Sequence, residues 1–536
     1  MNRNDLSVNI VGAGLAGLSA AITLARRGIS SRLISVQPSQ RAQSNLAEGG
    51  INAVMDVMGE NDTLGDHFRD TMEGGVYLAD PNMVRNLVNK APDIVRELSR
   101  IGVPFERKDG RLIQRAFGGQ NHRRTAFVKS TTGKALTVAL IDEARKYEAA
   151  GYIDRYSHHC FTRLLIRDGK CAGVQLKDIY SGQDIALPGD VVMSTGGLNG
   201  LFNGNTTGTT ANTGLAAAML LSQKVELANL EFIQYHPTTM NIKDKRLLIS
   251  EAARGEGGRL FALNDDGSRY YFMEDKYGER GNLMPRDVVS REMIFTGRDV
   301  YLDMTGIDSA VLKGRLSDLC EEIEHYFGID ASKEPIPVSP GIHYFMGGIL
   351  VDEGHHTNIP NLYAAGECAC AYHGANRLGG NSLLGAIFGG LTAAQSLAED
   401  MAGLPDDRFD INADEYIRPV SGLSDDEKDI ADSVRDILFK AMGIARDEDT
   451  LKMCLSRIET MDISGGSDEL SGIFNLSRAV IKCAMERKES RGAHYRTDYP
   501  DTLDEYRKIT VCRQDNGDIS ISFRDIPALK EDKNDK

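Results

Sequence analysis

Residues 7–28 read SVNIVGAGLAGLSAAITLARRG: an apolar run, three spaced glycines and an amphipathic stretch rich in small residues. This order predicts a buried strand, a tight turn and a helix, and the apolar SSRLISV at 30–36 predicts a second strand. Gly12, Gly14 and Gly17 form G-x-G-x-x-G, which serves a tight turn, close approach of a pyrophosphate and helix–strand packing. The helix N-terminus offers further N–H groups to phosphates. The stretch therefore predicts a dinucleotide-binding domain of the α/β class.

The end of the second strand departs from the usual dinucleotide fingerprint. An Asp or Glu is expected there to hold a ribose, whereas this chain has SVQ at 35–37. The missing acid makes NAD a less favoured cofactor, so the remaining interpretations are FAD or a variant dinucleotide site. Two later strands also end in glycines, DVVMSTGG at 190–197 and NLYAAGECA at 361–369, which suits a long dinucleotide lying across several strand ends. Glu367 is then a candidate ribose ligand, with a solvated loop acid as the alternative.

The character of the sequence changes along the chain. The sequence becomes irregular and polar after the first predicted strands that end in glycines. It later returns to the pattern of a strand followed by glycines. This change and return indicate an inserted second domain. The region that follows is charged and heptad-like, which predicts helices, and the charged end ALKEDKNDK is expected to be disordered. The predicted boundaries are 1–227 and 337–398 for the dinucleotide-binding domain, 228–336 for the insertion, 399–510 for the helical domain and 511–536 for a tail.

Composition restricts the class of protein. The 536 residues carry a formal net charge of −15, which argues against a nucleic-acid partner because such partners need a basic face. The eight cysteines include no C-x-x-C, so no iron–sulfur, zinc-ribbon or haem-attachment ligands are predicted, and free thiols fit a reducing compartment. The first glycine motif leaves no room for a signal peptide ahead of it, and no uncharged run approaches the ~18 residues of a membrane span. We therefore expect a cytoplasmic chain with no membrane span of its own.

HGANRLGGNSLL at 373–384 places one arginine, Arg377, among glycines, asparagines and a serine. Small residues let the backbone approach a ligand closely, and a guanidinium binds a carboxylate through two parallel hydrogen bonds. The stretch could therefore hold a flat cofactor beside a carboxylate. A glycine-rich turn with a surface arginine is the alternative.

Ten blocks along nearly the whole chain carry a resemblance to a known family. They read VGAGLAGLSAA, LAEGGINA, RAFGGQ, STGGLNGLF, EFIQYHPT, SEAARGEGG, PRDVVSR, KEPIPVSPGIHYFMGGI, GECACAYHGANRLGGNSLL and ERKESRGAHYRTDYP. In content and order the chain resembles the flavoprotein subunits of succinate dehydrogenase and fumarate reductase, with L-aspartate oxidase as a close relative. The resemblance implies a Rossmann-like FAD-binding domain, an inserted α+β capping domain and a C-terminal helical domain, in agreement with the boundaries above.

The resemblance also implies FAD as cofactor. The residues that it places along FAD belong to the glycine-rich turns and their neighbours: Gly12, Ala13, Gly14, Gly17, Ser35, Gly49, Gly50, Thr195, Gly196, Gly197, Glu367, Asn381, Ser382 and Leu383. Membrane-bound members usually bond FAD to a histidine in R-S-H-T, where this chain has RAQS with Gln43 at the histidine position. Glutamine has no nucleophilic nitrogen, so FAD is predicted to be noncovalent, which on family analogy lowers the flavin potential and favours fumarate reduction. Leu215 stands where the family commonly has aspartate, and no role is assigned to it.

A dicarboxylate lies against the flavin in this family. Carried over position by position, the resemblance implies that His236, His343 and Arg377 hold its carboxylates. Ser250 stands where the family usually has threonine, and its hydroxyl can make the same contact. Charge that develops in the transition state would be stabilised by these groups.

The resemblance further implies that Arg286 is the acid that protonates fumarate, while reduced FAD delivers hydride to the other olefinic carbon. The unperturbed pKa of arginine lies above ~12, so it can donate only if a relay returns the proton at once. In the family that relay corresponds to Glu251 and Arg254, and both are present here.

Phe117 in RAFGGQ separates two close relatives. Aspartate oxidases have a glutamate there for the substrate's amino group, and a phenylalanine leaves that buried ammonium without a carboxylate, at a large cost. NRLGGNSLL also resembles the succinate/fumarate side, whereas ANLEFIQYHPT and CAMERKESRG bear some likeness to aspartate oxidase. The prediction is therefore a fumarate reductase or succinate dehydrogenase flavoprotein, with L-aspartate oxidase as the alternative.

Electrons must reach the flavin from outside the chain, which carries no predicted cluster or haem ligands. A separate iron–sulfur subunit is the expected donor and could hold the chain at the cytoplasmic face of a membrane, and a soluble carrier is the alternative. An FAD-dependent RNA-modifying protein would share the first glycine motif but would need basic patches. A nonenzymatic flavin scaffold would leave the dicarboxylate ligands unexplained.

Overall fold

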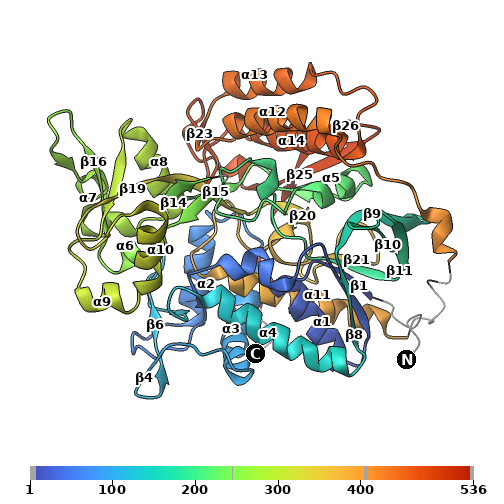
Figure 1. Cartoon of the computed structure of the whole chain (residues 1–536), viewed down its shortest axis with the longest axis horizontal. Helices are drawn as coiled ribbons and strands as arrows, with labels where there is room; N and C mark the ends of the chain where they lie inside the picture. The colour runs from blue at the N-terminus through green and yellow to red at the C-terminus, as the bar shows by residue number, and fades with distance from the viewer. Residues whose placement is uncertain (1–7, 244, 404–408, 410, 532–536) are drawn as a thin grey trace.

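The computed structural model describes residues 8–243, 245–403, 409 and 411–531. One sheet has the order β21-β12-β1-β2-β8 with every neighbouring pair parallel, and its labelled strands β1, β8 and β21 lie at the right of Figure 1. Its strands are β1 (Val8–Val11), β2 (Ser31–Ser35), β8 (Ile153–Ser157), β12 (Asp190–Met193) and β21 (Leu362–Ala364). β1 and β12 are buried along their whole length, as parallel strands covered on both faces are. The sheet confirms the predicted βαβ unit and the α/β class.

Helices pack against this sheet, and two of them also approach each other closely. α1 (Leu15–Arg26) follows β1 and packs against α11. A Cβ added at Gly390 of α11 would lie 2.2 Å from the carbonyl oxygen of Ala16, so the two helix backbones touch. The helices of this part are α2 (Leu64–Gly74), α3 (Pro81–Arg100), α4 (Thr132–Ala149), α5 (Leu215–Ser222) and α11 (Asn381–Met401). Its remaining strands are β3 (Ile51–Asn52), β4 (Arg107–Lys108), β5 (Arg111–Leu112), β6 (Gln114–Arg115), β7 (Thr125–Ala126), β9 (His159–Arg167), β10 (Lys170–Asp178) and β11 (Asp184–Pro188).

A second hydrophobic core lies within the predicted insertion and extends just beyond it, from Met240 to Val338. Its sheet has the order β15-β14-β19-β18-β16-β17 and lies at the left of Figure 1, whereas the parallel sheet lies at the right. The elements are β14 (Ile233–Ile242), β15 (Lys245–Leu248), α6 (Glu251–Gly255), β16 (Arg259–Leu263), β17 (Arg269–Tyr270), α7 (Phe272–Tyr277), α8 (Arg286–Phe295), β18 (Val300–Asp303), α9 (Ser309–Lys313), α10 (Ser317–Phe327) and β19 (Ile336–Phe345). β14 and β19 pair with each other and contribute side chains to both cores. Residues in the middle of these two strands therefore lie where the two units meet.

The C-terminal part contains three helices that pack on one another at the top of Figure 1. They are α12 (Asp425–Ala441), α13 (Glu448–Glu459) and α14 (Asp468–Glu486). α12 begins with a capping box in which Ser424 and Glu427 bond each other's backbone N–H groups. Within the described ranges no helix has both the length and the apolar composition that a membrane span requires.

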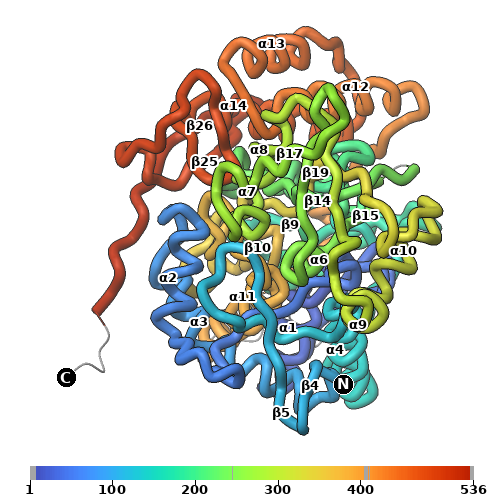
Figure 2. The backbone as a smooth tube through the Cα atoms, turned by 90° about the vertical axis from the view of Figure 1, so that its left-hand side faces the viewer, coloured from blue at the N-terminus to red at the C-terminus, as the bar shows by residue number. Residues whose placement is uncertain are grey.

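The predicted tail from residue 511 differs from the structure. β25 (Lys508–Asp515) and β26 (Asp518–Asp525) form a hairpin, and β25 pairs with β13 (Leu227–Ala228) in the sheet β22-β20-β13-β25-β26, which also contains β20 (Gly348–Leu350) and β22 (Ala369–Cys370). The chain then descends beside α3, where Asn82 bonds the backbone of Ala528 and Lys530 (Figure 2). Residues 532–536 of the stretch expected to be disordered lie outside the described residues.

Candidate active site

An open cavity lies at the carboxyl ends of the central strands. Its lining includes the residues that follow β1, β2, β12 and β21, which is where open α/β sheets bind nucleotides. Ten of the predicted cofactor residues line it: Gly12, Ala13, Gly14, Ser35, Thr195, Gly196, Gly197, Glu367, Ser382 and Leu383. The structure thus brings together turns that are far apart in the sequence.

The shape and polarity of this cavity fit a dinucleotide. Gly12 has φ +113° and a Cβ there would lie 2.1 Å from the Ser194 carbonyl oxygen, so the turn before α1 admits only glycine. Gly14 caps α1 without a side-chain hydrogen bond. The Leu15 N–H makes a long contact of 3.5 Å with the Ser44 hydroxyl, and the N-terminus of α1 can bind phosphate through its first turn. Glu367 is half-buried, and its partial burial raises the pKa of its carboxyl to about 7, so it can meet a ribose hydroxyl as donor or acceptor.

Four predicted cofactor residues lie off the cavity lining: Gly17, Gly49, Gly50 and Asn381. A Cβ at Gly17 would lie 1.9 Å from the Gly12 carbonyl oxygen, and one at Gly50 would lie 2.5 Å from Cγ2 of Thr125. The Asn381 side chain bonds Asn52 at 2.8 Å and Thr71 at 3.1 Å in a buried network. Gly17, Gly50 and Asn381 thus pack closely against protein atoms next to the cavity.

Sequence reasoning missed part of the lining. His159 and Cys160 reach the cavity from β9, and no local motif marks them. Gln43 also lines the cavity, and its Oε1 accepts a 2.6 Å hydrogen bond from the Thr209 backbone N–H. The side chain at the histidine position of the family is therefore held by protein backbone.

A buried ion cluster lies beside the cavity at the junction of the two units. Arg286 donates to Oε2 of Glu251 through Nε at 2.9 Å and Nη2 at 2.7 Å, and the Gly118 N–H donates to Oε1 at 2.9 Å. Arg254 Nη2 lies 3.9 Å from the same Oε1. Burial alone would raise the pKa of Glu251, yet the cations of Arg286 and Arg254 hold it below its ordinary value. Glu251 is thus an ionised carboxylate between two arginines.

Gln234, which sequence reasoning missed, joins this cluster to Arg377. Its Oε1 accepts hydrogen bonds from Arg286 Nη1 at 3.1 Å and from Arg377 Nη2 at 2.9 Å. Burial, reinforced by the nearby Arg286 cation, lowers the pKa of Arg377 to about 9, which leaves it charged at neutral pH. Gln234 lies two residues before His236 in β14, so the two-residue alternation of a strand could have pointed to it.

His236 and His343 lie side by side with ring centroids 5.2 Å apart. Burial and the Arg286 cation lower both pKa values well below the ordinary range, so both rings are neutral. His236 Nδ1 lies 3.1 Å from the Thr238 carbonyl oxygen, which assigns the ring proton to Nδ1 and leaves Nε2 as an acceptor. His343 Nδ1 lies 2.8 Å from the Thr207 hydroxyl, which can donate to it and leave an Nε2–H free.

Ser250 and Phe117 are also buried. Ser250 is the N-cap of α6, where its hydroxyl accepts from the Ala252 N–H at 3.4 Å. The Phe117 ring carries no charge, and a Cβ on Gly49 would lie 3.2 Å from it. Glu48, another residue missed from sequence, is half-buried, and removal of its carboxyl from water raises the pKa well above the usual range.

The backbone that carries Arg377 is held on both sides. The Ala375 N–H donates to the Gly75 carbonyl oxygen at 2.9 Å, and the Ala493 N–H donates to the Ala375 carbonyl oxygen at 3.0 Å. The Arg377 guanidinium lies 4.4 Å from the centre of the Tyr344 ring. The small residues around Arg377 therefore serve close backbone packing, and Arg377 is buried instead of lying on a surface turn.

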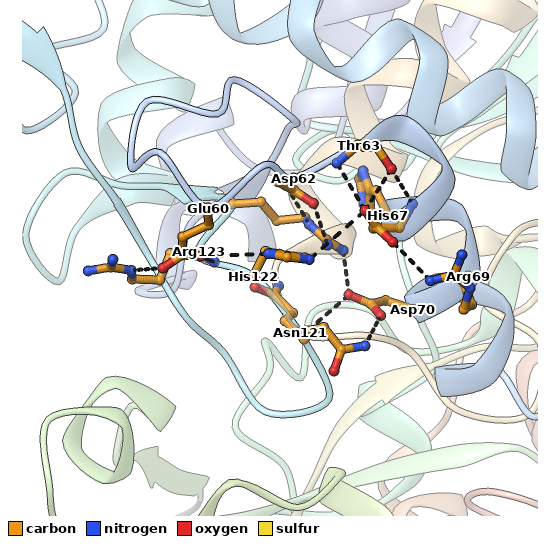
Figure 3. A network of polar contacts seen from close by, with 12 residues as sticks. Glu60, Asp62, Thr63, His67, Arg69, Asp70, Asn121, His122 and Arg123 are labelled. Atoms are coloured by element: carbon orange, nitrogen blue, oxygen red, sulfur yellow. Dashed lines mark hydrogen bonds and ion pairs between the residues drawn. The ribbon is translucent and has the colours of Figure 1, made fainter.

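A separate polar network contains carboxylate and imidazole groups of the kinds that bind metal ions (Figure 3). Among the described residues, ligand atoms of Asp62, Asp66 and His122 lie within 4.8 Å of one another. Arg124 binds Asp62 through Nε at 3.1 Å and Nη2 at 2.8 Å, and Arg69 binds Asp66 at 2.9 Å. The carboxylates are already paired with arginines, so the group is an ion-pair network and no metal role is assigned to it.

Comparison with known proteins confirms the family resemblance. The FAD binding domain family matches residues 7–383, and the family described as fumarate reductase flavoprotein C-term matches 467–531. The succinate dehydrogenase flavoprotein subunit of Bacillus subtilis is 36% identical, over 95% of this chain and 94% of its own. The L-aspartate oxidase of Pyrococcus furiosus is 33% identical, over 95% of this chain and 99% of its own.

A solved structure agrees with the relatives found by sequence. A mutated FrdA of E. coli quinol fumarate reductase superposes with a TM-score of 0.86 at 30% identity, over 98% of this chain and 97% of that one. The family model spans more than half of the chain, and the relatives span nearly all of it. The chain therefore belongs to the succinate dehydrogenase/fumarate reductase family of FAD-dependent flavoproteins.

Proposed function

We propose that this chain is a catalytic subunit that transfers a hydride between noncovalent FAD and fumarate or succinate, with Arg286 as proton donor. The observation that carries the proposal is the charge of the buried cluster. Arg254, Arg286 and Arg377 are cations, Glu251 is ionised, and the two histidines are neutral. These four residues together carry two positive charges, which complements a dicarboxylate dianion, while the nearby Asp287 carboxylate is bonded by Asn376.

Some residues of the site bind the substrate, and others transfer the proton. Arg377, His343 and Ser250 bind the carboxylates, and His236 adds a donor once Nε2 is protonated. Bound FAD supplies the hydride that adds to one olefinic carbon. Arg286 gives a proton from its guanidinium to the other carbon, and Glu251, bonded to two of its nitrogens, returns a proton that Arg254 passes on. Fumarate thereby gains one hydride and one proton and becomes succinate.

Gln43 supports a dissociable cofactor, because its amide oxygen is bonded to the Thr209 N–H and it offers no nucleophile. Phe117 supports a substrate without an ammonium group, since an aromatic ring forms no salt bridge with it. We propose that electrons come from a separate iron–sulfur subunit, as the B. subtilis relative is itself named a subunit. Membrane-bound partners would hold the complex at the cytoplasmic face.

The test is anaerobic. The flavoprotein is reduced with dithionite and flavin reoxidation is followed after fumarate is added, while L-aspartate is added to the oxidised enzyme in parallel. Rapid reoxidation by fumarate with no reduction by aspartate is expected. Reduction of the flavin by L-aspartate would replace the proposal with an amino-acid oxidase.

A further inference from the structure

Two dipeptides from different units of the fold face each other across Gln234. Arg286-Asp287 begins α8, and Asn376-Arg377 lies in the loop before α11. Both arginines donate to Gln234 Oε1, at 3.1 Å and 2.9 Å. The other two members bond each other, because Asn376 Nδ2 donates to Asp287 Oδ1 at 2.9 Å.

Gln234 closes these contacts into a ring. Its Nε2 donates to Asn376 Oδ1 at 2.7 Å and to the Arg377 carbonyl oxygen at 2.9 Å. Gln234 is fully buried, and Asn376 is 3% exposed. Every polar atom of the Gln234 side chain is therefore committed, and the ring ties α8 of the insertion to the loop that carries Arg377.

The direction of each hydrogen bond in the ring follows from Asp287. A carboxylate only accepts, so it fixes which end of the Asn376 amide faces it. Asn376 then presents its oxygen to Gln234, which in turn presents its own oxygen to the two guanidiniums. A glutamine, unlike a glutamate, holds two like charges near each other without cancelling the positive charge that a dianion needs.

We propose that Asp287 and Asn376 are positioning residues that fix the Gln234 amide and, through it, the placement of Arg286 against Arg377. The inference rests on the proposed function, in which these two arginines act on the same substrate. Loss of the Asp287 acceptor frees Asn376 to turn, and a turned Gln234 would aim its NH₂ group at two cations. A displacement of reacting groups by about 1 Å can cost on the order of a hundredfold in rate.

The test uses the holoenzyme and a swap of the two side chains. Asp287→Ala and Asn376→Asp are each expected to lower kcat/KM for fumarate by about tenfold to a hundredfold. The double variant Asp287→Asn with Asn376→Asp restores one donor and one acceptor in the opposite order, so it is expected to be more active than Asn376→Asp alone. Asp265→Ala, at a side chain that is 98% exposed in the same unit, is the matched control.

Two further measurements separate positioning from folding. The melting temperature and the FAD content of the variants should match those of the control, while the Kd for succinate, measured by calorimetry on the oxidised enzyme, should rise for Asp287→Ala. Unchanged kcat/KM in Asp287→Ala, or a swapped variant no better than Asn376→Asp, would overturn the inference. A wild-type enzyme that fails to reduce fumarate would instead overturn the proposed function, before any variant is compared.

Discussion

Among the residues that the structure describes, Arg286 is the one side chain that bonds both Glu251 and Gln234. Replacing Arg286 with Gln keeps a polar side chain but removes the cation and its exchangeable proton. Fumarate turnover is expected to fall by about a hundredfold to ten thousandfold, the range that general acids contribute, with FAD retained. Turnover is measured as anaerobic flavin reoxidation.

The control for that variant is Arg298→Gln, because Arg298 lies on the surface of the same unit and pairs with the exposed Asp265. It should turn over fumarate like the wild type. An Arg286→Gln enzyme that keeps near wild-type turnover would refute the role of Arg286 as proton donor.

The two histidines predict how dianion binding depends on pH. Their pKa values are lowered well below the ordinary range, so both are neutral in the free enzyme at neutral pH. A bound carboxylate favours the protonated ring of His236, whose Nε2 otherwise lacks a proton, so binding takes up a proton. Affinity for succinate should therefore rise as pH falls, by up to about tenfold per pH unit for one proton taken up.

Calorimetry in buffers of different ionisation enthalpy measures this uptake between about pH 6 and pH 8, below the pKa of about 9 of Arg377. His236→Asn, which cannot titrate, should show weaker binding with a flatter pH dependence. A Kd for succinate that does not change with pH in the wild-type enzyme would contradict the tautomer assigned to His236.

Helices and strands were predicted correctly from the sequence where a single segment with a regular apolar pattern determines the element. The glycine turn and the amphipathic run predicted β1 and α1, and the charged heptads predicted α12 to α14. The hairpin β25–β26 was missed although its signal is present. Asn516 and Gly517 both have positive φ, 51° and 89°, and Asn-Gly between alternating residues is a strong hairpin signal.

The hairpin turn leads to a prediction about stability. A Cβ at Gly517 would meet no atom within 4 Å, so only its φ of +89° penalises a side chain. Gly517→Ala should lower the free energy of unfolding by about 1–2 kcal/mol, the cost of a left-handed residue with a Cβ. Gly306→Ala is the matched control, since Gly306 is equally open and has no such φ. Equal urea midpoints for the two variants would refute the strain at Gly517.

Across the whole molecule, the site depends on contacts between residues that lie far apart in the sequence. Motifs marked Arg286, His343 and Arg377, but the ring through Gln234 depends on how β14, α8 and the loop before α11 meet. Glu48 and His159 were missed for the same reason, because nothing adjacent to them in sequence indicates what they face. Long-range packing decided these placements, whereas the glycine turns are fixed by local backbone geometry.

The cavity makes the stability of the whole chain depend on free FAD. A dissociable ligand that binds only the folded state stabilises it by about 1.4 kcal/mol for each tenfold rise in free ligand above Kd. Since Gln43 offers no linkage, the melting temperature should rise with added FAD, and acid precipitation should leave yellow flavin in the supernatant. NAD at equal concentration is the control, because the second strand ends without an acidic ribose ligand. Flavin in the acid pellet, with a melting temperature indifferent to FAD, would show a covalent bond to a residue other than Gln43.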